Sequence, residues 1–297
     1  MNQTYQSGFV SIVGCPNVGK STLLNAFIGQ KVSIVTDRAQ TTRNKITGVL
    51  TRKHYQLVFL DTPGITQPRN KLGDYMYQVS TDALNEVEAI LFVTDATQGI
   101  RERDEAIINL LGRRKTPVFA VINKCDAASL GNVTEMQEKL NATGIFHSVY
   151  KVSALNATGL EALEDALAGV MPEGPQYFPE DMVTDQPERI ICGEIIREKA
   201  LMLLREEVPH GIGVSIDKME MREDGTLMDV WATLYCERES HKGIIIGKGG
   251  SMLKKIGQAG RQDIEWLLGV RVNLQIWVKI KEDWRNKPAV LHELGYE

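Results

Sequence analysis

A pattern that binds phosphate lies near the N-terminus, in Gly14-Cys15-Pro16-Asn17-Val18-Gly19-Lys20-Ser21. Its order is Gly, four residues, Gly, Lys and Ser, and the glycines let several backbone N–H groups converge on one anion. Lys20 would reach the outer phosphates of a nucleotide, and the Ser21 hydroxyl would bind Mg²⁺. We therefore expect this stretch and the following Thr22 to hold a nucleotide, rather than to form a chance glycine turn.

A second stretch, Asp61-Thr62-Pro63-Gly64, follows an apolar run at 57–60. An Asp at the end of a strand can hold Mg²⁺ through a water, and the Gly64 N–H can meet a γ-phosphate. Pro-Gly is also common in ordinary turns, which is the plainer interpretation. The position of this stretch one strand after a phosphate loop favours the nucleotide site, so we expect all four residues to belong to it.

The base of the nucleotide is indicated by Asn123-Lys124-Cys125-Asp126, which follows an apolar run at 118–122. The Asp126 carboxylate can accept hydrogen bonds from guanine N1–H and the N2 amine, whereas adenine lacks this pair of donors. The Asn123 amide would contact the base edge and brace the loop, and the Lys124 stem would cover the ring. Backbone N–H groups of Ser153-Ala154-Leu155 would bind guanine O6. A kinase for a small molecule would not need guanine specificity, so the pattern disfavours that class.

A polar loop, Gln40-Thr41-Thr42-Arg43, lies between the first expected helix and the second strand. A threonine hydroxyl in such a loop can complete the Mg²⁺ shell when a γ-phosphate is present, and this ordering would be a switch. The adjacent threonines leave the assignment open, and we prefer Thr42, which directly precedes Arg43. The expected metal ligands are therefore Ser21, Thr42 and Asp61.

The elements that must position these residues alternate between two patterns from position 7 to about 170. Strands are expected at 9–13, 46–50, 57–60, 89–94, 118–122 and 147–152, and helices at 20–28, 75–85, 103–111, 134–140 and 160–170. This alternation predicts an α/β domain in which helices cover both faces of a mostly parallel sheet. Ligands bind at the carboxyl ends of the strands in such folds, and the motifs above follow strands.

The composition is that of an ordinary globular chain, with 297 residues, of which 43% are hydrophobic and 24% charged. The four cysteines form no CxxC pair and no His cluster accompanies them, which favours free thiols in a reduced cytoplasm over a metal site. No apolar run approaches the length of a membrane span, and the first residues lack the character of a signal peptide.

In this order and spacing, the five motifs resemble those of the translation-factor-related GTPases. The resemblance implies GTP/GDP and Mg²⁺ as cofactors, and action on the transferring phosphate by Asn17, Lys20, Thr42 and Gly64. Small GTPases place a water-positioning Gln directly after Asp-x-x-Gly, where this chain has Ile65, so we predict slow intrinsic hydrolysis that needs help. In related families an Asn at the position of Asn17 coordinates K⁺; a loop-bracing amide is the equal alternative.

The second half of the chain follows a proline-rich stretch at 172–187, which predicts an extended connection between domains. We expect a helix at 188–206, strands at 212–219 and 226–236, a helix at 240–246, a glycine loop, a helix at 251–268 and a strand at 270–280. The loop Gly247-Lys248-Gly249-Gly250 between two helices looks like the core of a KH domain, and the preceding helix and strand indicate type II. The expected domains are a P-loop GTPase (G) domain at 1–171, a linker at 172–187 and an α+β type II KH domain at 188–297.

A Gly-x-x-Gly loop lets an RNA backbone approach closely. The expected RNA contacts are Ile246, Gly247, Lys248, Gly249, Gly250 and Lys254. Ten Lys and Arg stand against four Asp and Glu between positions 241 and 287, so this stretch carries +6 in a chain of net charge −4. Such a basic module predicts localised phosphate contact. Trp266 and Trp277 can stack on bases, but we expect them to fill the core.

A GTPase domain that is joined through Tyr177-Phe178-Pro179-Glu180-Asp181 to a type II KH domain looks like the bacterial Era family. The resemblance implies binding near the 3′ end of small-subunit ribosomal RNA and a part in assembly and maturation of the small ribosomal subunit. It also implies a cytoplasmic monomer, with peripheral contact to the inner membrane left open. The competing hypothesis is a nucleotide-dependent scaffold that acts through protein or membrane partners.

Overall fold

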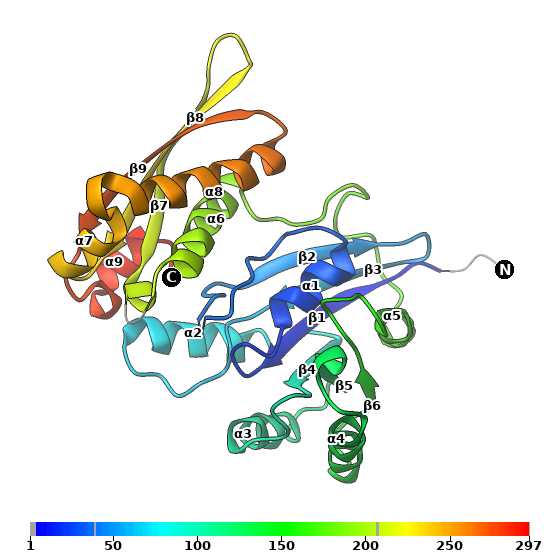
Figure 1. Ribbon diagram of the computed structural model, residues 1–297. Helices are drawn as coiled ribbons and strands as arrows, with labels where there is room; N and C mark the ends of the chain where they lie inside the picture. Colours follow the sequence, from blue (N-terminus) through cyan, green and yellow to red (C-terminus); the bar gives the residue numbers. More distant parts are fainter. Residues whose placement is uncertain (1–3, 39, 206–207, 297) are drawn as a thin grey trace. The chain divides into compact units, whose positions relative to one another are not determined.

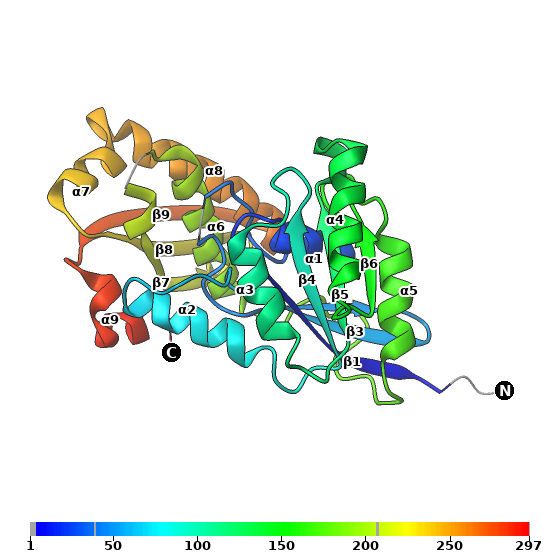
Figure 2. The ribbon, with the colours of Figure 1, turned by 90° about the horizontal axis from the view of Figure 1, so that it is seen from below.

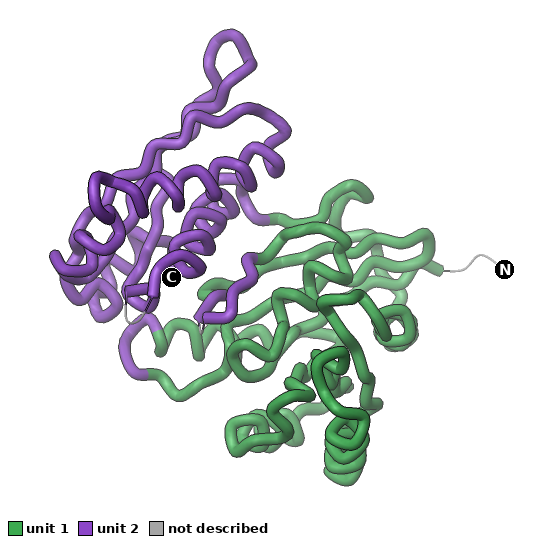
Figure 3. The backbone as a smooth tube through the Cα atoms, in the orientation of Figure 1, with its two compact units in different colours: residues 1–33, 42–68, 73–185 green, residues 34–41, 69–72, 186–297 purple. Residues whose placement is uncertain are grey.

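The computed structural model describes residues 4–38, 40–205 and 208–296, which fall into two compact units. The N-terminal unit comprises residues 1–33, 42–68 and 73–185, and the C-terminal unit comprises 34–41, 69–72 and 186–297 (Figure 3). The short segment 34–41 therefore groups with the C-terminal unit, although it lies early in the chain. The ends of the expected domains, residues 1–3 and 297, lie outside the described residues, as does Glu206, where the expected helix at 188–206 would end.

The N-terminal unit is built on a sheet with the strand order β2-β3-β1-β4-β5-β6 (Figure 1). Its strands are β1 (Gln6–Gly14), β2 (Ile46–Thr51), β3 (Tyr55–Asp61), β4 (Ala89–Asp95), β5 (Val118–Asn123) and β6 (Ser148–Lys151). All neighbours are parallel except β2 and β3, which are antiparallel. The strands β1, β3, β4 and β5 are almost wholly buried, because helices pack on the sheet, whereas β6 at its edge is half-buried. The expected α/β fold is confirmed.

The helices of this unit are α1 (Lys20–Ile28), α2 (Lys71–Asp82), α3 (Glu102–Leu111), α4 (Leu130–Ala142) and α5 (Leu160–Val170) (Figure 2). Helix α4 is longer than the expected 134–140 because the Ser129 side chain caps it, accepting a hydrogen bond from Asn132 N at 3.3 Å. Helix α2 begins and ends earlier than the expected 75–85. The chain turns tightly after Asp82, where Leu84 N donates to the carbonyl of Thr81 at 3.2 Å.

The proline-rich stretch is not a free connection, because residues 172–185 group with the N-terminal unit and hydrogen-bond to its sheet. Ser7 N donates to the Pro172 carbonyl at 3.1 Å, and Val49 N donates to the Val183 carbonyl at 2.8 Å. The buried Gln56 side chain accepts hydrogen bonds from the backbone N–H groups of Tyr177 and Phe178, at 2.9 and 3.0 Å. The stretch is thereby fixed to the unit that precedes it in the chain.

The C-terminal unit has the expected element order of a KH domain, with further short elements. Its parts are α6 (Glu188–Leu203), η2 (Val208–Gly211), β7 (Gly213–Met221), β8 (Leu227–Cys236), α7 (Glu239–Ile246), η3 (Lys248–Gly250), α8 (Ser251–Leu268), β9 (Arg271–Ile280), η4 (Trp284–Asn286) and α9 (Pro288–Glu293). The strand β8 pairs antiparallel with β7 and parallel with β9. Helices α6 and α8 pack on this sheet and on each other. Among the helices in the described part of the chain, none combines the length and apolarity that crossing a membrane requires.

The prediction that Trp266 and Trp277 fill the core is wrong, since their exposed fractions are 67% and 45%. Helix α8 directs Ile256, Gly260 and Ile264 inward at a spacing of four residues, so Trp266 lies on the opposite face. In β9 the side chains alternate, and the neighbours of Trp277 on both sides pack into the core. Trp284, which the sequence did not single out, is fully buried and donates from Nε1 to the Gly211 carbonyl at 2.9 Å.

Replacing Gln56 should destabilise the N-terminal unit. The side chain of Gln56 also donates from Nε2 to Thr51 Oγ1 and to the Phe178 carbonyl, each at 2.9 Å. Gln56→Ala removes these bonds from a buried position, so we expect a loss of about 2–3 kcal/mol in the free energy of unfolding, measured by urea denaturation of the full chain. The exposed Gln176 donates to the same Phe178 carbonyl, and Gln176→Ala should cost less than about 0.5 kcal/mol. Equal losses would contradict the anchoring role of Gln56.

Candidate functional site

The predicted phosphate loop connects β1 to α1 at the carboxyl end of the sheet. Gly14 has a φ of 153° and Gly19 a φ of 97°. A Cβ on Gly14 would lie 2.2 Å from the Val93 carbonyl oxygen, and one on Gly19 would lie 2.2 Å from Asn123 Nδ2. Only glycine fits either position. Cys15 and Val18 are each 1% exposed, so within this loop they offer a ligand their backbone and not their side chains.

Lys20 is folded back over its own loop. Its Nζ donates to the carbonyls of Gly14 and Cys15, at 3.2 and 3.1 Å, and the residue is buried. Burial lowers the pKa of Lys20, and the nearby Asp61 carboxylate acts in the opposite direction. The ammonium group therefore lies inside the loop, where a phosphate could replace the two carbonyls as its partner.

The three predicted metal ligands meet at one place, although they come from separate parts of the sequence. Ser21 Oγ donates to Asp61 Oδ2 at 2.6 Å and lies 2.9 Å from Thr42 Oγ1. Thr42 Oγ1 lies 3.5 Å from the same Asp61 oxygen, and Ser33 Oγ donates to it at 3.1 Å. We call these four residues the Asp61 cluster. The Thr41 hydroxyl is engaged elsewhere, since it donates to the Arg38 carbonyl at 2.7 Å.

The Asp61 cluster has the chemistry that Mg²⁺ requires. Its members offer hydroxyl and carboxylate oxygens, which are the hard ligands that this ion prefers. Asp61 is fully buried, and its Oδ1 has no hydrogen-bond partner among the described residues. Burial raises the pKa of Asp61, while Lys20 and the three hydroxyl groups act to lower it. A cation at this place would satisfy the unpaired oxygen.

The residues after Asp61 run along the phosphate loop. Thr62 Oγ1 donates to the Ile12 carbonyl at 2.8 Å, and Ser80 Oγ donates to the Pro63 carbonyl at 2.8 Å. Gly64 lies against Pro16, and Ile65 N donates to the Gly14 carbonyl at 3.2 Å. The Ile65 side chain is 9% exposed and packs in the hydrophobic core. It therefore offers a water neither a polar atom nor a free surface.

One side chain joins the phosphate loop to the two loops predicted to bind the base. Asn123 Nδ2 donates to the Val18 carbonyl at 2.9 Å, and its Oδ1 accepts from Ala154 N at 2.9 Å. Asp126 is exposed in the short helix η1 (Cys125–Ala127), which follows β5, and Leu155 is 78% exposed. Ser153 is buried and accepts at Oγ from Asn156 N at 3.2 Å. The structure thus brings the predicted base loops to the phosphate loop.

Three further residues, Asp95, Asn25 and Ser33, shape this site, although no motif in the sequence indicates them. Asp95, the last residue of β4, binds Lys124 Nζ at 2.7 Å and accepts from Thr97. Burial acts to raise the pKa of Asp95, but the hydrogen bonds from Lys124 and Thr97 outweigh it and lower that pKa. Asn25 accepts from the N–H groups of Val32 and Ser33, and so it holds Ser33 beside Asp61. The one feature of the sequence that could have indicated Asp95 as a site residue is its position at the carboxyl end of a parallel strand, where ligands bind in such folds.

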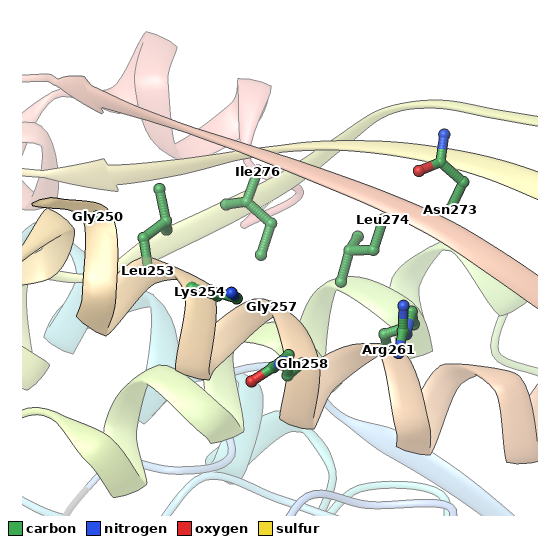
Figure 4. A pocket seen from close by; sticks show the side chains of 9 residues that line it. All are labelled: Gly250, Leu253, Lys254, Gly257, Gln258, Arg261, Asn273, Leu274 and Ile276. Carbon is green, nitrogen blue, oxygen red and sulfur yellow. The ribbon is translucent and has the colours of Figure 1, made fainter.

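The C-terminal unit has a groove of about 320 Å³ that begins at the glycine loop (Figure 4). Its walls come from α8 and β9, and its lining residues are Gly250, Leu253, Lys254, Gly257, Gln258, Arg261, Asn273, Leu274 and Ile276. Of the predicted RNA contacts, Gly250 and Lys254 line this groove. Ile246 is the last residue of α7, and Gly247, Lys248 and Gly249 lie in the turn that leads from it into the groove. The sequence missed the other lining residues, which only the pairing of α8 with β9 brings together.

Comparisons with known proteins find a matching family for each half of the chain. Residues 9–124 match the family described as 50S ribosome-binding GTPase, and residues 207–285 match the KH domain family. GTPase Era of Alkaliphilus metalliredigens is 50% identical over 294 residues, covering 99% of this chain and 100% of that protein. GTPase Era of Clostridioides difficile is 49% identical over 296 residues, covering 98% and 99%.

Two solved structures are similar over nearly the whole chain. One is a crystal structure of Era in complex with MgGDPNP and nucleotides 1506–1542 of 16S ribosomal RNA, with a TM-score of 0.95 and 41% identity, covering 98% of this chain and 99% of that one. The other is a variant of Aquifex aeolicus Era bound to GDP and AlF₄⁻, with a TM-score of 0.94, 41% identity and the same coverage.

The fold and the phosphate loop define a P-loop GTPase with a C-terminal KH domain. Relatives that are 49–50% identical over nearly the full chain narrow the class to one family. The chain belongs to the Era family of GTPases, and its activity is the hydrolysis of GTP.

Replacing Asp95 should weaken nucleotide binding without changing the base specificity. Asp95→Asn removes the ion pair that holds Lys124, whose stem is predicted to cover the base, so we expect an affinity for GDP that is about 3- to 10-fold lower. The matched control is Glu164→Gln, which neutralises a carboxylate paired with Arg52 at 2.7 Å on another part of the same unit. Fluorescence titration measures both. A Glu164→Gln variant that binds GDP as weakly as Asp95→Asn would contradict the specific role of Asp95.

Proposed function

We propose that this protein is a GTP-controlled RNA-binding enzyme that acts near the 3′ end of small-subunit ribosomal RNA and assists assembly and maturation of the small subunit. One observation carries the proposal. The Era structure that holds both MgGDPNP and a segment of 16S ribosomal RNA resembles this chain over 98% of its length. The Asp61 cluster and the groove between α8 and β9 support these two kinds of ligand. A monomer in the cytoplasm, with or without peripheral membrane contact, stays a prediction.

The Asp61 cluster supports Mg²⁺ and GTP as the ligands of the N-terminal unit. Ser21, Thr42 and Asp61 would hold the ion, which would neutralise charge on the phosphates. Lys20 would exchange its two loop carbonyls for phosphate oxygens, and the Gly64 N–H would meet the γ-phosphate. With Ile65 packed in the core, attack by water lacks the usual positioning side chain, which supports slow intrinsic hydrolysis.

The groove of the C-terminal unit supports a single strand of RNA as its ligand. Lys254 and Arg261 on α8 would contact phosphates, and the glycine loop would let the backbone approach closely. Leu253, Leu274 and Ile276 offer an apolar floor for unstacked bases. The groove therefore suits a nucleic-acid strand, which has a charged backbone and apolar base faces, better than a small polar molecule.

RNA affinity should depend on the nucleotide. A γ-phosphate would order Thr42 and the residues 61–65, and a switch requires that RNA bind the two states with different affinity. We expect the dissociation constant for an RNA with the sequence of the small-subunit 3′ end to differ at least about 10-fold between a GTP analogue and GDP, measured by filter binding at fixed salt. Equal constants would refute the coupling.

Two neighbouring lysines provide a matched control for the RNA site. Lys254 lines the groove and Lys255 does not, although both are exposed on α8. Lys254→Ala should weaken RNA binding about 5- to 10-fold and reduce its salt dependence by about one counterion, whereas Lys255→Ala should change it less than about 2-fold. The scaffold hypothesis expects both variants to bind their protein or membrane partner normally.

We also propose that K⁺ binds beside Asn17 and assists hydrolysis. Asn17 has a φ of 66°, and its carbonyl accepts from Lys124 Nζ at 2.7 Å, which fixes the loop at this point. The GTPase rate should then be about 10-fold higher in KCl than in NaCl at equal ionic strength, and Asn17→Ala should remove the difference. Equal rates in the two salts would instead support the bracing role of the amide.

A further inference from the structure

Helix α6 of the C-terminal unit holds the segment 34–41, which leads directly into Thr42. Arg197 on α6 donates to the carbonyls of Thr41 and Gln40, in the latter case at 3.4 Å. Glu198, the next residue on the helix, accepts from Val35 N at 2.9 Å. Near the helix end, Arg38 Nη2 lies 3.5 Å from the Leu204 carbonyl. Both ends of the segment are thus attached to the same helix.

The side chains that make these contacts are fixed. The Arg197 side chain is 0% exposed and is paired with Glu194, which accepts from its Nε at 2.7 Å. Glu198 is 1% exposed and pairs with Lys199 at 3.0 Å, and Lys199 in turn binds Asp263 on α8 at 2.6 Å. Buried groups held by charged partners lose little further entropy when they bind a loop, so α6 is a rigid support for the segment.

Described residues of the segment also hydrogen-bond to one another. The hydroxyls of Thr36 and Thr41 lie 2.7 Å apart, and the Thr41 hydroxyl donates to the Arg38 carbonyl. The contacts of Val35 and Thr41 with α6 therefore act near the two ends of a segment whose last peptide bond leads to Thr42. Thr42 contributes its hydroxyl to the Asp61 cluster, 2.9 Å from Ser21 Oγ.

We propose that Arg197 and Glu198 are positioning residues for the GTP-bound state, because they hold the segment 34–41 so that the Thr42 hydroxyl points at the Mg²⁺ site. The proposal rests on the assignment of Ser21, Thr42 and Asp61 to Mg²⁺ under the proposed function. A hydroxyl that is already in place costs less ordering when the γ-phosphate arrives. By thermodynamic reciprocity, GTP would stabilise the attachment of the segment to α6 to the same extent.

The test compares affinities for a non-hydrolysable GTP analogue and for GDP, both with Mg²⁺, in the full-length protein. Arg197→Met removes the donors at similar volume, and it should raise the dissociation constant of the analogue about 5- to 20-fold while that of GDP changes less than about 2-fold. Arg197→Lys keeps a cation that can reach the carbonyls, and should recover most of the loss. A purely structural role would weaken both nucleotides alike, which would overturn the proposal.

Arg189 provides the matched control on the same helix. It donates to the carbonyls of Ile216 and Asp217 in β7 and makes no described contact with the segment 34–41. Arg189→Met should leave both affinities unchanged. A GTP-selective loss in this variant would mean that any loosening of α6 suffices, and would overturn the specific role of Arg197.

Two further variants keep the result decisive. Should Arg197→Met fail to fold, Glu198→Leu removes the acceptor for Val35 N together with the partner of Lys199, and it should give a smaller loss in the same direction. Glu198→Gln removes the charge but keeps an acceptor oxygen for Val35 N, and it should bind normally. Thr42→Ala should lose affinity for the analogue alone. If Thr42→Ala is not selective, the assignment of Thr42 to Mg²⁺ under the proposed function fails. If it is selective while Arg197→Met and Glu198→Leu are not, only the inference about α6 fails.

Discussion

Burial of the Asp61 carboxylate is the constraint around which the nucleotide site is organised. A charged group without partners is costly in a protein interior, and the cost is offset when hydroxyl donors surround it. These donors come from Ser21 at the start of α1, from Ser33 in the following loop, and from Thr42. A single buried side chain thus fixes three stretches of the chain, and its second oxygen is left for a cation.

Asn123 has the corresponding role on the other side of the phosphate loop. Its amide satisfies one backbone carbonyl and one backbone N–H from two different loops, so neither loop can shift without leaving a buried polar group unpaired. This interaction explains why an amide serves better here than a carboxylate or a hydroxyl. An amide donates and accepts at fixed geometry, and the Gly19 backbone leaves just enough room for it.

In the C-terminal unit, one face of α8 packs in the core and another lines the groove. Ile256, Gly260 and Ile264 face the core, and the small Gly260 allows close approach of α6 at Ile196. Leu253, Gly257 and Arg261 face the groove at a spacing of four residues. Glycines on both faces keep the helix near its neighbours, which leaves a groove with an apolar floor and a basic rim.

The sequence by itself determined the class of fold, the order of the elements and the places of the predicted binding loops between them. These are local features: the glycine spacing at 14–19, the apolar runs that end at each motif, and the Gly-x-x-Gly loop between two helices. The sequence did not determine the residues whose role depends on distant partners. Asp95, Asn25 and Gln56 look like ordinary polar residues until their strands and loops pair. Trp266 and Trp277 are exposed, contrary to the prediction, because the periodicity of a helix or strand does not say which of its faces packs against the core. Likewise, only the tertiary structure grouped the segment 34–41 with α6, since Arg197 and Thr41 are far apart in the chain and their contact leaves no pattern in the sequence.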